Sequence, residues 1–387
     1  MVRTGRVEKE RRGTDSREAR LKARARRASA ACPPLSSPPP PSPLLYVVGS
    51  LNADLVLSLA RLPAPGETLA ASSLSTFPGG KGGNQAVAAA KLGWPTRMVG
   101  LVGGSSRGEE APPSSPSPPP SPDGGGALLL ASLAGAGVDT RYVACLAGVP
   151  TGTAVIMVQE GTGENSIVIV AGANGEEGAW LAGQALAGAM ADLARGPASV
   201  GALLLQREVP DAVNTAAAAA ARSGGVPVLL DVGGDDAPLP ASLLACVDVV
   251  SPNESELARL TGLEAGTAAE AARAACALLD AAPGVRAVLV KRGAAGSLLV
   301  ERGRRGGPPT ITSQAAAPVV AVVDTTGAGD CFTAAYAVAS LRGLEPTARL
   351  RYASAAAGLC VQARGAGPSM PGGAAVDAAL EAWERVK

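Results

Sequence analysis

From Leu44 onward, the chain alternates short apolar runs with longer segments of helical character. The apolar runs are rich in Val and Leu and lack regular polar alternation: Leu44–Val48, Arg97–Val102, Ala202–Leu205, Val226–Asp231, Val247–Ser251 and Ala287–Lys291. The intervening segments are Asn84–Leu92, Ala127–Leu133, Asp211–Arg222, Ala268–Leu279, Cys331–Leu341 and Thr347–Gln362. Unalternated apolar strands separated by helices predict an α/β three-layer sandwich, in which helices cover both faces of a mostly parallel central sheet.

One region departs from this alternation. Thr153–Gln159 and Asn165–Ala171 have strand character, and the Glu-Gly-Thr-Gly-Glu between them is typical of a hairpin turn. Thr68–Phe77 supplies a further strand. We therefore expect a small β lid beside the main sheet, built from about residues 55–77 and 141–172.

Two tracts stand apart by composition. Residues 33–43 and 112–122 each contain seven prolines, mixed mostly with serine. Such tracts favour extended, solvated backbone and cannot build a packed core. We expect residues 1–43 to form a disordered extension and 44–387 one folded domain, interrupted by an insertion at 109–126. A genuine insertion and an error in the gene model both fit this pattern.

The charges are distributed unevenly. Residues 1–31 hold eleven Lys and Arg against four Asp and Glu, whereas the rest of the chain holds 23 basic and 29 acidic residues. A mildly acidic body argues against nucleic-acid binding. The basic segment, rich in Arg, Ala and Ser, has the composition of an organelle-targeting presequence, although its acidic residues are unusual for one. A disordered tail or a mis-assigned start codon is the alternative.

Histidine is absent, and this excludes several kinds of chemistry. Neither a Ser-His-Asp triad nor an H-E-x-x-H zinc site is possible. The six cysteines form no C-x-x-C pair, which indicates reduced thiols in a reducing compartment, the plastid or the cytoplasm. No run approaches the roughly 18 apolar residues of a membrane-spanning helix, so we expect no membrane partner.

The most informative motif lies near the C-terminus, where Asp324-Thr-Thr-Gly327-Ala328-Gly329-Asp330 follows an apolar strand predicted over Val319–Val323. The glycines allow a sharp turn with N–H groups facing a ligand, and the following helix start adds partial positive charge. A carboxylate at Asp330 can accept a proton from an incoming hydroxyl. A capped helix after a glycine turn has the same pattern without any chemistry.

This motif resembles a signature of the carbohydrate kinase family of the ribokinase (PfkB) type. Five further stretches resemble family motifs in the expected order: Gly49–Asp54, Gly79–Ala86, Gln206–Pro210, Ser251–Glu256 and Gly365–Pro371. The resemblance extends from about Leu44 to the C-terminus. Gln206–Pro210 and Leu230–Gly234 are most similar to the plant and algal branch.

The resemblance implies ATP-dependent phosphorylation of D-ribose at O5 to give D-ribose 5-phosphate. Asp330 would be the general base, and Gly327, Ala328 and Gly329 would form an anion hole. The sugar would contact Asn52, Asp54, Gly80, Lys81, Asn84, Glu208 and Asp330. Gly80-Lys81 is not part of a P-loop, because Gly82 stands where Ser or Thr is required.

The resemblance also implies sites for nucleotide and metal ions. The nucleotide would lie against Asn253, Lys291, Gly293, Gly296 and Gly329. Glu256 would organise Mg²⁺ through water, and an activating K⁺ would be held by Asp324, Thr326, Cys360, Gly365 and Ser369. Mg²⁺ and K⁺ both prefer oxygen ligands. A homodimer formed through the β lid is expected as well.

One departure and three alternatives qualify this interpretation. The family usually has an Asp after the segment that here reads Gly100–Gly103, whereas this chain has Gly104. The chain could instead phosphorylate another sugar or a nucleoside, such as fructose, deoxyribose or adenosine. It could also be a non-catalytic sugar sensor on the same fold. A dinucleotide-binding oxidoreductase is disfavoured, because no G-x-G-x-x-G follows the first strand.

Overall fold

Nine strands form the large sheet at the centre of the fold. The computed structural model describes residues 42–105, 120–161, 165–303 and 306–385. The strand order is β13-β12-β11-β10-β9-β8-β1-β4-β5, and only β12 and β13 run antiparallel to their neighbours. The strands are β1 (Leu44–Val48), β4 (Thr96–Gly104), β5 (Asp139–Ala147), β8 (Val200–Gln206), β9 (Val228–Asp231), β10 (Val249–Ser251), β11 (Ala287–Lys291), β12 (Ser297–Glu301) and β13 (Thr310–Gln314).

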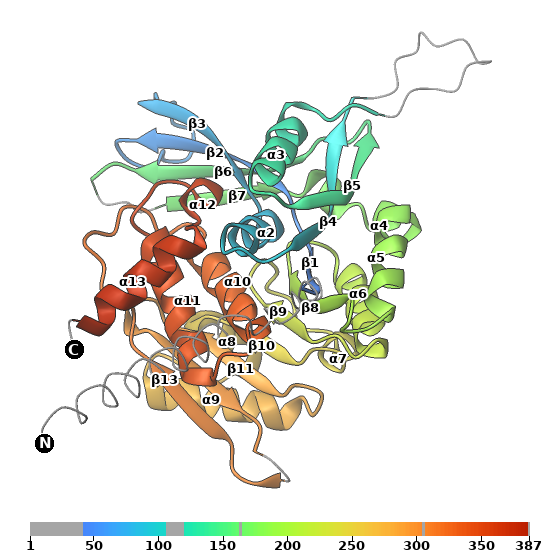
Figure 1. The fold of residues 1–387 in the computed structure, drawn as a ribbon. Helices are drawn as coiled ribbons and strands as arrows, with labels where there is room; N and C mark the ends of the chain where they lie inside the picture. Colours follow the sequence, from blue (N-terminus) through green and yellow to red (C-terminus); the bar gives the residue numbers. More distant parts are fainter. Residues whose placement is uncertain (1–41, 106–119, 162–164, 304–305, 386–387) are drawn as a thin grey trace, which may run out of the picture. The chain divides into compact units, whose positions relative to one another are not determined.

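Helices cover both faces of this sheet because successive strand side chains point to opposite sides. In β1, Tyr46 and Val48 face one buried cluster, and Leu45 and Val47 face another. The first cluster includes α4 (Glu177–Ala182), α5 (Gln184–Ala194), α6 (Asp211–Ser223), α7 (Ala241–Leu244), α8 (Glu254–Thr261) and α9 (Ala268–Ala281). The second includes α2 (Lys81–Lys91), α3 (Gly124–Gly135), α10 (Ala328–Leu341), α11 (Pro346–Cys360) and α13 (Gly373–Arg385). The predicted α/β three-layer sandwich is confirmed (Figure 1).

A smaller sheet lies beside the large one, next to α3 and the short α12 (Ala366–Ser369) (Figure 1). Its order is β3-β2-β6-β7, with β2 (Asn52–Leu59), β3 (Ser73–Gly79), β6 (Gly152–Gln159) and β7 (Asn165–Val170). β6 and β7 pair antiparallel, as the hairpin signal predicts. The expected lid range of 141–172 includes most of β5, but β5 is the edge strand of the large sheet.

The strand predicted over Val319–Val323 is wrong. Within the described ranges this segment pairs with no strand, and Val320 is 96% exposed. The backbone N–H groups of Val323 and Asp324 instead donate to the carbonyl of Val361 at the end of α11. The large sheet has already ended at β13, so a Val-rich sequence here forms an exposed loop. Among the described residues, none of the helices is long and apolar enough to span a membrane.

Candidate active site

A cleft opens where β9, β10 and β11 end and α10 begins. Parallel strands present their carboxyl ends at one edge of a sheet, and ligands of such folds bind there. The cleft is lined by charged side chains, namely Lys81, Asp231, Glu254, Glu256, Lys291, Arg292 and Asp330. Gly327, Ala328 and Gly329 line the same cleft. The structure therefore brings the predicted anion-binding turn and the predicted base together.

Gly327 determines how α10 begins. Its φ of 78° lies in the left-handed region, and a Cβ there would come 2.8 Å from the Cβ of Ala366. Only glycine fits such a position without strain. The turn directs the start of α10 into the cleft, with Asp330 in its first turn. The Ala328 N–H donates to the Thr325 carbonyl, but no side chain caps the helix, so the N–H groups of Gly329 and Asp330 can bind an anion.

Asp330 is 5% exposed and held by two amides of α2. Asn84 Nδ2 donates to its Oδ2 over 2.9 Å, and Gln85 Nε2 donates to its Oδ1 over 3.3 Å. Burial raises the pKa of Asp330 to about 6, with Lys81 opposing the shift and Asp231 adding to it. A carboxylate with this pKa is mostly ionised at neutral pH and is a stronger base than an exposed aspartate.

Glu208 organises the side of the cleft toward the small sheet. Its Oε2 accepts from Ser50 Oγ at 2.6 Å, from the Lys81 backbone N–H at 3.0 Å and from Asn52 Nδ2 at 3.5 Å. Asp54 lies nearby and is 8% exposed. Burial and the charges of Glu208 and Asp330 raise the pKa of Asp54 to about 7.

The predicted sugar-contacting residues thus converge around Asp330. The amide oxygen of Asn84 is buried and has no hydrogen-bond partner among the described residues. Position 80 requires glycine for a structural reason. Its φ is 82°, and a Cβ would come 2.7 Å from the backbone nitrogen of Asn52. Gly80 therefore lets α2 begin directly against β2.

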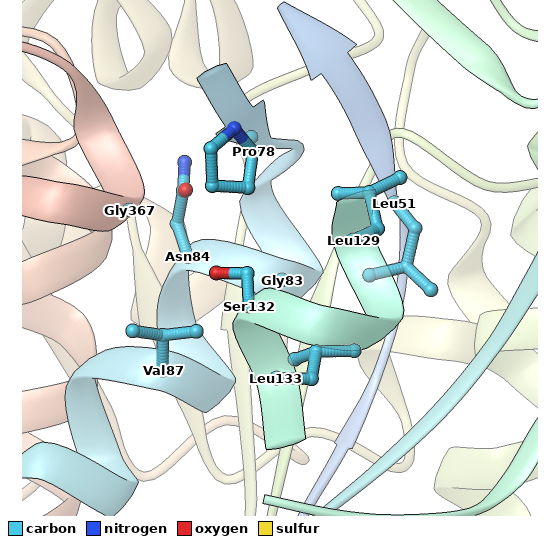
Figure 2. A pocket seen from close by; sticks show the side chains of 10 residues that line it. Leu51, Pro78, Gly83, Asn84, Val87, Leu129, Ser132, Leu133 and Gly367 are labelled. Atoms are coloured by element: carbon cyan, nitrogen blue, oxygen red, sulfur yellow. The ribbon is translucent and has the colours of Figure 1, made fainter. Parts of the chain in front are cut away.

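A small apolar pocket lies beside Asn84, between α2, α3 and β3. Figure 2 shows Leu51, Leu129 and Leu133 along its walls, with Pro78 near Asn84. These side chains come from α3, from β3 and from the link between β1 and β2. The packing fixes the first turn of α2, and with it the position of the Asn84 amide.

Asn253 and Glu256 combine a structural role with a position in the cleft. Asn253 Oδ1 accepts from the Glu256 N–H at 2.8 Å, and Glu256 Oε2 accepts from the Asn253 N–H at 2.7 Å. This reciprocal capping box starts α8. Glu256 Oε1 and Lys81 Nζ both lie about 3 Å from the position that a Cβ on Gly233 would take.

The predicted nucleotide turn is a hairpin between β11 and β12. Gly293 and Gly296 have φ values of 50° and 89°, and both line the cleft. A Cβ on Gly296 would come 2.1 Å from the carbonyl oxygen of Gln314, so this position requires glycine. Lys291, which precedes the turn, makes a 2.7 Å ion pair with Asp231.

Asp324 joins the two loops that contain the predicted K⁺ ligands. Its Oδ1 accepts from the Thr326 N–H at 2.9 Å, and its Oδ2 accepts from the Gly365 N–H at 2.8 Å. Ser369 Oγ lies 3.1 Å from Cys360 Sγ. Within the described ranges, no three His, Cys, Asp or Glu side chains gather as a metal site. A cation here would therefore need backbone carbonyls and the Ser369 hydroxyl in addition to the single carboxylate of Asp324.

Comparison with known proteins assigns this architecture. The model of the pfkB family of carbohydrate kinases matches residues 42–111 and 123–372. The chain belongs to the pfkB family of carbohydrate kinases. A ribokinase of Arabidopsis thaliana is 43% identical over 345 residues, which cover 89% of this chain and 82% of that protein. A ribokinase of Haemophilus influenzae is 32% identical over a stretch that covers 84% of this chain and 95% of that protein.

Solved structures of pfkB kinases have the same fold. The structure of Arabidopsis thaliana ribokinase complexed with ribose and ATP matches with a TM-score of 0.73 and 43% identity, covering 88% of this chain and 99% of that one. A ribokinase from Thermotoga maritima matches with a TM-score of 0.69 and 31% identity, covering 87% and 99%.

Asp123, where the second matched stretch of the family begins, lies next to Gly103 in the fold. Its N–H donates to the Gly103 carbonyl, and its carboxylate accepts from Thr151 Oγ1 at 2.6 Å and from the Gly126 N–H at 2.7 Å. It therefore caps α3. The family match also skips residues 112–122. Of the expected insertion, residues 109–119 lie outside the described part of the chain.

Proposed function

We propose that this chain transfers the γ-phosphoryl group of ATP to O5 of D-ribose, giving D-ribose 5-phosphate and ADP. The carrying observation is the buried carboxylate of Asp330 at the start of α10, beside the turn of Gly327–Gly329. The similarity to the Arabidopsis ribokinase complexed with ribose and ATP supports ribose as the acceptor.

In the proposed reaction, Asp330 accepts the proton of the O5 hydroxyl as this oxygen attacks the γ-phosphorus. The new O–P bond forms as the bond between the γ-phosphorus and the β,γ-bridging oxygen breaks, leaving ADP. The backbone N–H groups of Gly327–Gly329 donate to the transferring group, where charge is concentrated. Asn84 and Gln85 hold the carboxylate toward the acceptor.

The residues present fit a magnesium ion bound mainly through water and phosphate. Glu256 lines the cleft, and its Oε1 is turned toward Lys81. We propose that Glu256 organises the water shell of Mg²⁺, which supplies charge neutralisation at the phosphates. The nucleotide would lie along Asn253, Lys291 and the Gly293–Gly296 turn, all of which line the same cleft.

We propose K⁺ as an activator held between the Asp324 and Gly365 loops. The donor set would be the Asp324 carboxylate, the Ser369 hydroxyl and the backbone carbonyls of Thr326, Cys360 and Gly365. The carboxylate of Asp324 already joins these loops through two N–H groups. A cation there would act indirectly, by fixing the turn that forms the anion hole.

We also propose a homodimer in which the small sheet serves as the lid. β3 and β7 are its edge strands, and β7 carries four half-exposed apolar side chains, Ile167, Val168, Ile169 and Val170. Pairing of such edges across a two-fold axis would cover them. Unpaired thiols such as Cys331 and Cys360 suit the reducing environment of plastid or cytoplasm.

A coupled assay of ATP consumption on the full chain tests the function. It compares D-ribose, D-fructose, 2-deoxyribose and adenosine, each in K⁺ and in Na⁺ buffer. We expect turnover selective for ribose and stimulated by K⁺. Selective turnover of another acceptor would refute ribose and retain the phosphoryl transfer. A folded protein that binds ATP but turns over none of the four would refute the kinase reaction for these acceptors and favour a sensor.

A further inference from the structure

Asp231 ends β9 inside the cleft and has no role in the reaction described so far. Its side chain is 2% exposed. Oδ2 accepts from Lys291 Nζ at 2.7 Å and from Thr333 Oγ1 at 3.0 Å, and Oδ1 accepts from the Gly233 N–H at 3.1 Å. Burial alone would raise the pKa of Asp231, but the ammonium groups of Lys291 and Lys81 keep it below its usual value.

Gln85 connects this carboxylate to the proposed base. Its Nε2 lies 3.3 Å from Asp330 Oδ1 and 3.5 Å from Asp231 Oδ2. The amide orientation is fixed from the other side, because Gln206 Nε2 donates to Gln85 Oε1 over 2.7 Å. The NH₂ group of Gln85 therefore faces both carboxylates.

Lys291 extends the network to the phosphoryl side. Its Nζ lies 3.8 Å from the position that a Cβ on Gly329 would take, directly at the anion-binding turn. The buried carboxylate of Asp231 thus contacts two groups. One is the Lys291 ammonium at this turn, and the other is the Gln85 amide, which in turn contacts Asp330. A carboxylate that only stabilised the fold would not need to contact both Lys291 and Gln85.

We propose that Asp231 is a positioning residue for phosphoryl transfer, fixing Lys291 at the Gly327–Gly329 turn and tuning Asp330 through Gln85. Its assignment to phosphoryl transfer rests on the proposed function. Its effect on the charge of Asp330 is independent of the acceptor sugar and can be measured without turnover.

The charges around Asp330 determine the sign of the effect. Several titratable groups face it: Lys81 from α2, Glu208 after β8, Asp231 from β9, Lys291 from β11, Asp54 from β2, and the thiols of Cys331 from α10 and Cys360 from α11. Asp231→Asn removes a negative charge and leaves the Lys291 ammonium unpaired. Both changes favour the ionised form of Asp330 and lower its pKa. Lys291→Met removes a positive charge and leaves Asp231 unpaired, so it should raise the pKa of Asp330.

The test compares wild type, Asp231→Asn, Lys291→Met and the double variant. Carboxyl ¹³C NMR titration follows Asp330, whose resonance is identified by its absence from Asp330→Asn. We expect the Asp330 pKa to fall by about one unit in Asp231→Asn, to rise in Lys291→Met and to return toward wild type in the double variant. Direct titration also separates Asp330 from Asp54, which titrates in the same region.

Kinetics with whichever sugar the wild type phosphorylates supply the second measurement. Asp231→Asn should lower kcat about 10- to 100-fold and leave the sugar KM within about threefold. Asp192→Asn is the matched control, because it also removes the carboxylate of an ion pair, the one with Arg97. Arg97 lies near the start of β4, at the end of the sheet opposite the cleft. It should lower stability without changing the titration of Asp330.

Unchanged Asp330 pKa values in the folded variants would overturn the proposal, as would equal effects from Asp192→Asn. If Asp231→Asn does not fold, the rise expected in Lys291→Met decides alone. Absence of turnover with every sugar would refute the proposed function, and the NMR titration would still decide whether Asp231 tunes Asp330.

Discussion

At the residue scale, the site concentrates acidic groups around one cation. Asp330 is the main reason that the pKa of Lys81 is held well above its usual range, with Asp231, Glu208 and Glu256 adding to the effect. Asp330, Glu208 and Asp231 each also accept a hydrogen bond from α2. Removing a single charge should therefore change function and stability in directions that can be worked out.

Asp330→Asn should lower kcat by about 10² to 10⁴-fold, because an amide cannot accept the proton of the attacking hydroxyl. Binding of ribose and of ATP, measured by calorimetry, should change only a few-fold, since asparagine retains the shape and much of the hydrogen bonding. Circular dichroism checks that the variant is folded. Full activity in a folded variant would show that Asp330 is not the base.

Asp54→Asn should stabilise the free protein at alkaline pH while weakening sugar binding. Folding raises the pKa of Asp54 from 3.8 to about 7, so ionising this group opposes folding. This cost to the free energy of unfolding is absent below about pH 4, grows between about pH 4 and 7, and is fully present above about pH 7. Thermal scans should show a Tm gain of about 5 °C at pH 8 that vanishes near pH 4. A gain independent of pH would contradict this origin.

At the element scale, the sequence predicted the central strands well and the loops poorly. β1 and β11 agree with their predicted bounds, because buried parallel strands need continuous apolar runs. Val319–Val323 has the same composition but lies where no strand is available to pair with it. Composition records the preference of a segment, whereas the available sheet edge decides its structure.

The site shows the same division between local and long-range information. Asp330 and the Gly327–Gly329 turn are contiguous in sequence and were predicted together. Asp231 and Gln85 matter through contacts across the fold, with Thr333 and Asp330 as partners, so no local pattern marks them. Asp123 was missed because an insertion separates it from Gly103, although Asp-Gly directly before an apolar helix is itself a capping signal.

Asp123→Ala should both destabilise the fold and weaken sugar binding. It removes the cap of α3 and two hydrogen bonds to Thr151, at a cost of about 1–2 kcal/mol. The start of α3 also packs on β2, since a Cβ on Gly125 would lie 3.3 Å from that of Ala53. Urea denaturation and ribose KM are the measurements. Both the stability loss and a several-fold rise in KM are expected.

Thr267→Ala provides the matched control for that variant. It removes the N-cap of α9, where Thr267 forms a capping box with Glu270. The loss of stability should be comparable, and the ribose KM should stay unchanged because α9 contributes no side chain to the cleft. A rise in KM in both variants would show that general destabilisation, and not the position of β2, affects sugar binding.

At the scale of the whole molecule, the small sheet exposes the apolar side chains of its edge strand β7. We expect the wild-type chain to have twice the mass of the 38.0 kDa protomer in multi-angle light scattering. Ile169→Lys should yield the protomer mass, because a charge on an edge strand opposes strand pairing between copies. Ile311→Lys is the matched control: Ile311 is 50% exposed on β13, the edge of the large sheet, and Ile169 is 49% exposed. A dimer that dissociates equally with both substitutions would place the interface elsewhere, and a monomeric wild type at micromolar concentration would refute the dimer.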